Sequence, residues 1–108
     1  MNVSFEEIGR LAVTFAQDGC AAGQVCKLGS DGSVTACAAG DKFCGIVEGV
    51  RGGFAAVQME GFATVSITGA VNLGYVNLCA DGAGGVKAGS GREYLVVQVN
   101  ADTAVIKL

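Results

Sequence analysis

The segment Val57–Val76 has the sequence VQMEGFATVSITGAVNLGYV, and it decides the fold class of this 108-residue chain. Ala63, Val65 and Ile67 alternate with polar residues, which is the period-two pattern of a strand with one buried face. Glycines interrupt the pattern where a strand must bend or turn, at Gly61, Gly69 and Gly74. The segment therefore predicts β-structure broken by tight turns.

The same pattern extends in both directions along the chain. Leu11, Val13 and Phe15 alternate with Ala12, Thr14 and Ala16, which is the period-two pattern of a strand. Asp-Gly and Gly-Gly pairs mark turns between the apolar runs. The expected strands are Leu11–Ala16, Gln24–Leu28, Ser33–Cys37, Phe43–Val50, Phe54–Met59, Phe62–Thr68, Tyr75–Cys79, Val86–Ala88, Tyr94–Asn100 and Thr103–Leu108. Such strands predict an all-β fold, a small barrel or sandwich.

An internal repeat of about 50 residues divides this β domain, which we expect to span residues 9–108. Gly40-Asp41-Lys42-Phe43 in the first copy matches Gly91-Arg92-Glu93-Tyr94 in the second. The copies cover about 23–59 and 74–108, and neither buries its apolar face alone, so we expect them to pack together. Residues 1–8 are predicted to form an N-terminal arm, with one helical turn over Ser4–Ile8.

Composition excludes several classes of protein. Hydrophobic residues make up 51% of the chain and charged residues 16%, which is too apolar for disorder. No apolar run approaches the roughly 20 residues that cross a bilayer, so no membrane partner is expected. The net charge is −3 and the seven basic residues are scattered, which argues against direct binding of nucleic acid.

The five cysteines are odd in number and irregularly spaced, with no CxxC pair and no histidine in the chain. We therefore predict buried, reduced thiols rather than a metal site. Cys20 follows a turn signal and is expected to be the most exposed thiol. The N-terminus lacks the basic and apolar regions of a secretion signal, so we expect synthesis in a reducing cytoplasm.

No catalytic pattern emerges, and we expect no enzyme activity, no catalytic residues and no cofactor. Without histidine, a Ser-His-Asp arrangement is impossible. Most carboxylates beside glycine fit turn chemistry. The segment Asp81–Gly91 (DGAGGVKAGSG) matches neither the phosphate-loop nor the dinucleotide-binding pattern, and it is predicted to be a flexible surface loop.

The longer stretch Val57–Gly89 resembles the head-decoration, or capsid cement, proteins of bacteriophages. The shared phrase is a valine-rich strand, Gly61, an alternating strand, Gly69-Ala70-Val71, and then Asp81-Gly82 before Val86. The opening Gly9–Val25 and the ending Thr103–Leu108 are similar to the same family, although five cysteines are unusual for it. The resemblance implies a phage or prophage virion protein that binds the major capsid protein lattice, as a homotrimer, and stabilises it by non-covalent bridging.

Two alternative functions remain open from the sequence. One is a tail protein or another surface assembly subunit. The other is a small lipoyl- or biotinyl-like carrier module, in which Asp41-Lys42 would present Lys42 for modification. Phe43, the next residue, fits better as part of the core.

Overall fold

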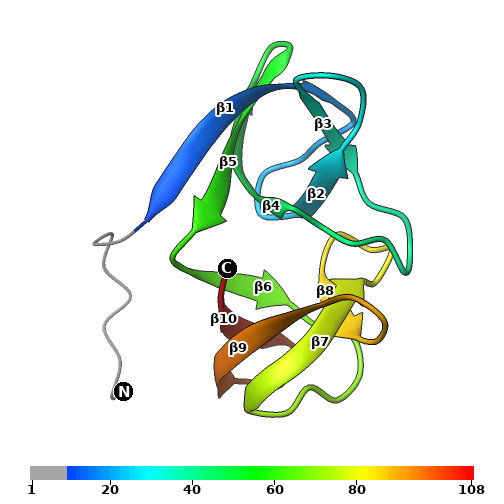
Figure 1. The fold of residues 1–108 in the computed structure, drawn as a ribbon, viewed down its shortest axis with the longest axis vertical. Coiled ribbons are helices and arrows are strands. Elements are labelled where there is room, and N and C mark those ends of the chain that lie inside the picture. The colour runs from blue at the N-terminus through cyan, green and yellow to red at the C-terminus, as the bar shows by residue number, and fades with distance from the viewer. Residues whose placement is uncertain (1–9) are drawn as a thin grey trace.

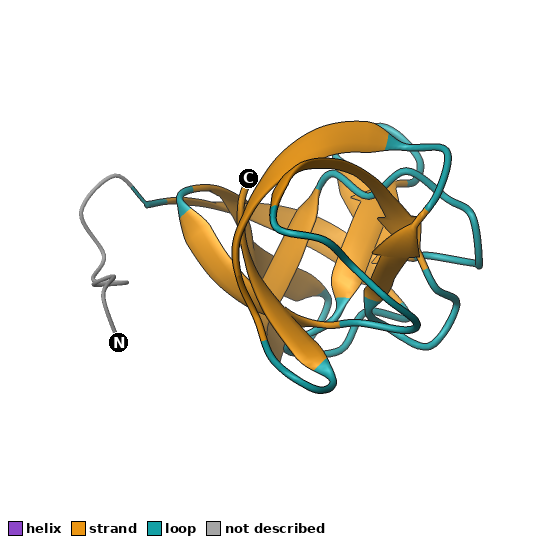
Figure 2. Ribbon diagram, turned by 90° about the horizontal axis from the view of Figure 1, so that it is seen from below, coloured by secondary structure: helices purple, strands orange, loops and turns teal. Residues whose placement is uncertain are grey.

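The computed structural model describes residues 10–108, which form strands and turns without any helix (Figure 2). The predicted all-β class is confirmed, and each of the ten expected strands is present within two residues of its expected bounds. Accordingly, no helix in residues 10–108 is long and apolar enough to cross a membrane. The expected arm at 1–8 and the helical turn over Ser4–Ile8 lie outside the described residues.

The first five strands close into a barrel, called here the first barrel, in the upper half of Figure 1. β1 (Leu11–Asp18) runs antiparallel to β5 (Phe54–Glu60) and parallel to β3 (Ser33–Ala36). β2 (Val25–Leu28) and β4 (Gly45–Arg51) complete the circuit with antiparallel pairs. Closure gives every strand of the first barrel two neighbours along at least part of its length.

The other five strands form the second sheet, in the lower half of Figure 1. Its order is β6-β10-β9-β7-β8, and the neighbouring strands pair antiparallel. A parallel bridge between Ile67 and Val86 joins the end of β6 to β8. The strands are β6 (Phe62–Ser66), β7 (Gly74–Ala80), β8 (Val86–Ala88), β9 (Arg92–Val99) and β10 (Thr103–Lys107).

The two halves share one topology, which gives the internal repeat a structural form. In each half the first strand pairs antiparallel with the fifth and meets the third in parallel. Gly32 and Gly82 occupy equivalent turns before the third strand, at φ values of 71° and 85° that favour glycine. Each structural unit is longer than the matched sequence, because β1 and β6 precede the matched stretches.

One core cluster crosses from the first barrel into the second sheet. Val25, Phe43 and Ile46 of the first barrel are buried together with Val65, Leu78, Val86, Tyr94, Val96 and Ile106 of the second sheet. A smaller group fills the first barrel itself and is called the first-barrel core: Cys26, Val34, Val47, Ala55 and Val57. The shared cluster explains why the two copies form one domain, since each half covers apolar surface of the other.

The passage between the halves is held by a buried glutamine. Gln58 is 5% exposed, and its Nε2 donates to the carbonyl oxygens of Glu60 and Phe62, each at 3.0 Å. The N–H of Leu108 donates to the carbonyl of Gly61 at 2.9 Å, so the end of the chain is tied to the same junction. These bonds tie carbonyl groups on both sides of the bend between β5 and β6 to one buried side chain and to the end of the chain.

The first half of β1 is largely exposed although its sequence alternates. Leu11 is 47% exposed, Val13 is 37% exposed and Phe15 is partly buried. The physical reason is that β1 pairs with β3 only at residues 16–18, which leaves the barrel wall open beside the first half of β1.

Candidate docking surface

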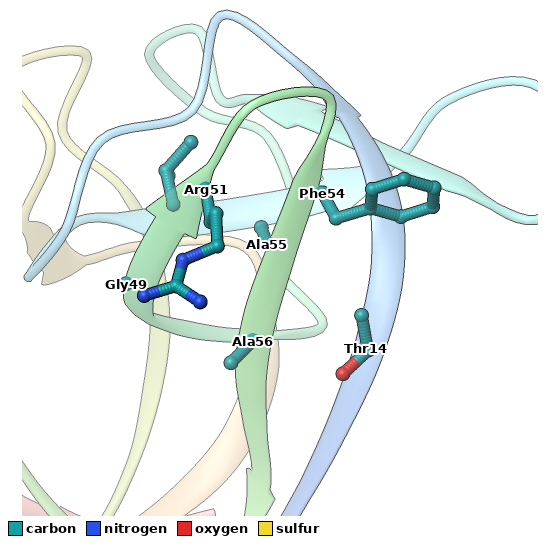
Figure 3. Close-up of a pocket in the computed structure, with 7 residues that line it drawn as sticks. Thr14, Gly49, Arg51, Phe54, Ala55 and Ala56 are labelled. Carbon is teal, nitrogen blue, oxygen red and sulfur yellow. The ribbon is translucent and has the colours of Figure 1, made fainter.

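The outer side of β1, β5 and β4 carries an apolar hollow of about 460 Å³ near the tip of the β4–β5 hairpin (Figure 3). Gly49 and Ala56 are register partners with little or no side chain, so they leave space above the sheet. Thr14 pairs with Ala56 from the other side. Arg51 and Phe54 pair at the end of the hairpin and border the hollow.

Phe54 is the most conspicuous side chain of this surface. It is 60% exposed, and Figure 3 shows its ring directed away from the Arg51 side of the hairpin. Val50, which also lines the hollow, is 39% exposed. A large exposed aromatic beside an arginine and a shallow apolar hollow is the combination found at the centres of protein interfaces.

The free edge of β1 lies beside this surface. Among the described residues, no strand pairs with Leu11–Phe15 along the edge opposite β5. In an antiparallel pair, the backbone groups of successive residues point alternately toward and away from the partner strand. The N–H of Gln17 donates to Gly53 O, so the odd-numbered residues of β1 point toward β5. The backbone N–H and C=O groups of Ala12 and Thr14 therefore face the free edge. An edge of this kind is a template for pairing with a strand of another chain.

A second exposed apolar patch lies at the start of β7, where Leu73 is 66% and Tyr75 is 72% exposed. In Figure 1 the start of β7 and the tip of the β4–β5 hairpin lie at opposite ends of the long axis. The described part of the chain therefore exposes apolar side chains at both ends of its long axis.

Ionisable side chains among the described residues form ion pairs that link segments far apart in the sequence. The Lys27 ammonium donates to the Asp41 carboxylate at 2.6 Å, and this bond, followed by one from Ala38 N, lowers the pKa of Asp41. Arg10 forms an ion pair with Glu48. Among residues 10–108, no three His, Cys, Asp or Glu side chains gather closely enough to hold a metal ion.

The Gly-rich segment that begins at Asp81 was predicted to be a flexible surface loop, but it forms side-chain hydrogen bonds and a short strand. Asp81 Oδ1 accepts from the N–H groups of Ala83 and Gly85 at 2.7 and 3.0 Å, and Thr68 Oγ1 donates to Oδ2 at 2.8 Å. Val86 is fully buried at the start of β8, so the loop prediction is wrong for that strand. The prediction that Asp81 serves turn chemistry is confirmed.

The remaining candidate residues lie apart from the docking surface. Lys42 is exposed in the segment between β3 and β4, which is not the tip of a two-strand hairpin, and Phe43 beside it is buried as expected. The prediction of buried cysteines holds for two of the five, which are all free thiols in this structure. Cys26 and Cys79 are buried, and Cys20 is partly buried like Cys37 and Cys44 rather than being distinctly more exposed.

The hollow itself had no sequence signal that we identified. Its floor depends on the register that places Gly49 opposite Ala56 and Ala56 opposite Thr14, and that register follows from two separate strand pairings.

The chain matches no protein-family model, and no curated protein matches it either.

Proposed function

We propose that this chain is a non-catalytic virion subunit that decorates an assembled phage or prophage capsid and reinforces it by bridging neighbouring subunits. The observation that carries the proposal is the pair of exposed apolar patches, around Phe54 and around Tyr75, at opposite ends of one β unit. A bridging subunit needs two contact regions on a rigid scaffold, and it needs no reactive group.

The surface around Phe54 is assigned to the major capsid protein. Aromatic side chains and arginine contribute most to binding when a partner covers them, and Phe54 and Arg51 lie side by side at the hairpin tip. The small residues on the floor of the hollow allow a partner backbone or side chain to approach closely. Many such contacts, repeated over a lattice, give strong attachment even when each is weak.

The free edge of β1 is assigned to a neighbouring copy in the proposed homotrimer. Backbone pairing at an edge does not depend on a particular partner sequence, and the edge residues Leu11–Phe15 carry no charge that would oppose another strand. The resemblance to head-decoration proteins supports the same oligomer.

The decisive experiment is sedimentation of the purified chain with capsids of the encoding phage or prophage. Phe54→Ser should weaken co-sedimentation at least about tenfold, because loss of a central aromatic contact costs about 2 kcal/mol. Leu28→Ser is the matched control: Leu28 is 62% exposed but lies outside the hollow, so its binding should match wild type.

Three outcomes would contradict the proposal. Equal binding of wild type and Phe54→Ser would remove the assigned surface. Absence of the chain from purified virions would remove the function. Light scattering that shows a monomer at high concentration would remove the trimer, while leaving attachment to the lattice intact.

A further inference from the structure

Three of the five cysteines meet in the first barrel. Cys26 on β2 is completely buried in the first-barrel core. Cys20 and Cys44 are partly buried and pack against the same core from the segments before β2 and before β4. The sequence spacing of these cysteines is irregular, so the fold alone brings them together.

Cys26 and Cys44 are direct neighbours across the pairing of β2 with β4. The N–H of Cys44 donates to the carbonyl of Cys26 at 2.8 Å, while Gly45 is the register partner of Cys26. Cys44 and Gly45 thus both lie opposite Cys26. Facing residues of an antiparallel ladder have Cα atoms about 4.5–5.5 Å apart, and the backbone hydrogen bond holds Cys44 beside the Gly45 position that faces Cys26. The two cysteines are therefore close to the Cα separation of about 4.4–6.8 Å that a disulfide bridges.

The two thiols are chemically unequal. The Cys26 thiol donates to the carbonyl of Gly45 at 3.7 Å, next to Cys44. Its closeness to the Cys44 sulfur lowers the pKa of Cys44 to about 7 despite the partial burial of Cys44. The Cys44 sulfur and burial together raise the pKa of Cys26. By contrast, burial raises the pKa of Cys20, and it raises the pKa of Cys37 to about 11. Of the partly buried thiols, Cys44 is the one that carries substantial thiolate at neutral pH.

We propose that Cys26 and Cys44 are a redox-active dithiol that converts to an intramolecular disulfide by exchange with a small disulfide such as oxidised glutathione. The partly exposed Cys44 thiolate attacks one glutathione sulfur, breaks its S–S bond and releases one glutathione thiolate. Cys26 then loses its proton to solvent and attacks the Cys44 sulfur, releasing the second glutathione. The protein loses two electrons and two protons, and one oxidised glutathione becomes two reduced molecules.

This disulfide would link β2 to the chain entering β4 and enclose β3 in the closed loop. The link would span strands that are already paired, so the fold need not rearrange. It would also remove the reactive thiolate of Cys44. The inference concerns the first barrel alone and does not depend on the proposed function.

The test uses the full chain, treated with oxidised glutathione at pH 7.5, quenched in acid, alkylated and analysed by intact mass and tryptic mapping. We expect two thiols to become protected and the peptide Phe43–Arg51 to be linked to Leu11–Lys27, with fragmentation of the linked peptides placing the bond on Cys26 and the alkyl group on Cys20. The rate of glutathione attachment to Cys44 should rise with pH as the Cys44 thiol, whose pKa is lowered, ionises. The thermal midpoint of the oxidised form should rise by about 4 °C or more, because the link constrains the unfolded chain.

Variants identify the partner and the order of steps. Cys26→Ala should stop at a glutathione adduct on Cys44, and Cys44→Ala should abolish the reaction. Cys44 is partly exposed, so this second variant keeps the test valid if Cys26→Ala does not fold. Cys20→Ala and Cys37→Ala are matched controls that should still form the link. A wild-type protein that keeps five alkylated thiols, retains the adduct, or joins Cys44 to Cys20 or Cys37 would overturn the proposal.

Discussion

The rings of Phe43 and Tyr94 stack on each other with centroids 4.8 Å apart and planes inclined by 9°. The Tyr94 hydroxyl also donates to the carbonyl of Phe43 at 3.2 Å. Phe43 lies just before β4 in the first copy of the repeat, Tyr94 lies within β9 of the second copy, and both are buried. The repeat therefore contacts itself, which makes this pair a central joint between the first barrel and the second sheet.

We predict that Tyr94→Phe lowers the free energy of unfolding by about 1 kcal/mol, because it leaves a buried carbonyl without its donor. Phe43→Ala should cost about 3–5 kcal/mol through the loss of a buried ring. Urea unfolding followed by circular dichroism measures both. Tyr75→Phe is the control, since Tyr75 is 72% exposed and its change should be within about 0.5 kcal/mol. Equal effects of Tyr94→Phe and Tyr75→Phe would contradict this account of the joint.

Asp81 gives a pH-dependent prediction. Burial alone would raise the pKa of Asp81, but the hydrogen bonds from Ala83, Thr68 and Gly85 outweigh it and lower that pKa. A lowered folded-state pKa means that the contribution is present above the unfolded value of about 3.9 and is lost as the pH falls through the folded value. Asp81→Ala should therefore cost about 1–2 kcal/mol at pH 7 and progressively less toward pH 2.

Asp31→Ala is the matched control for that measurement. Asp31 precedes Gly32 as Asp81 precedes Gly82, but among the described contacts its exposed carboxylate accepts no hydrogen bond. Its substitution should change stability by less than about 0.5 kcal/mol at either pH. A difference between wild type and Asp81→Ala that stays constant from pH 7 to pH 2 would refute the role of the ionised carboxylate.

Two glycines of β4 give a matched steric pair. A Cβ atom at Gly45 would lie 2.5 Å from Gln58 O and 2.6 Å from Val57 Cγ1, whereas one at Gly49 would have no neighbour within 4 Å. Gly45→Ala should destabilise the chain by about 1–3 kcal/mol, because both contacts are with packed atoms of β5. Gly49→Ala should be neutral or stabilise by up to about 1 kcal/mol. Thermal unfolding of both variants decides the matter, and similar midpoints would count against the packing described for β4 and β5.

The sequence by itself determined the β class, the strands and the doubled plan. Alternation in segments such as Phe62–Ser66 and Asp-Gly turns such as Asp31-Gly32 are local signals, because side-chain direction and turn geometry depend on a few neighbouring residues. Phe43 was predictable as a core residue for the same reason, since it follows the polar residues Asp41 and Lys42 and begins an apolar run.

Only the tertiary structure decided which strands meet, and the surfaces proposed for docking follow from that choice. The short parallel pairing of β1 with β3 exposes Leu11 and Val13, and the register of β4, β5 and β1 forms the hollow beside Phe54. The contact of Cys26 with Cys44 likewise depends on how β2 pairs with β4. Pairing between distant segments is set by the packing of the whole core, and no local pattern in a single sequence records it.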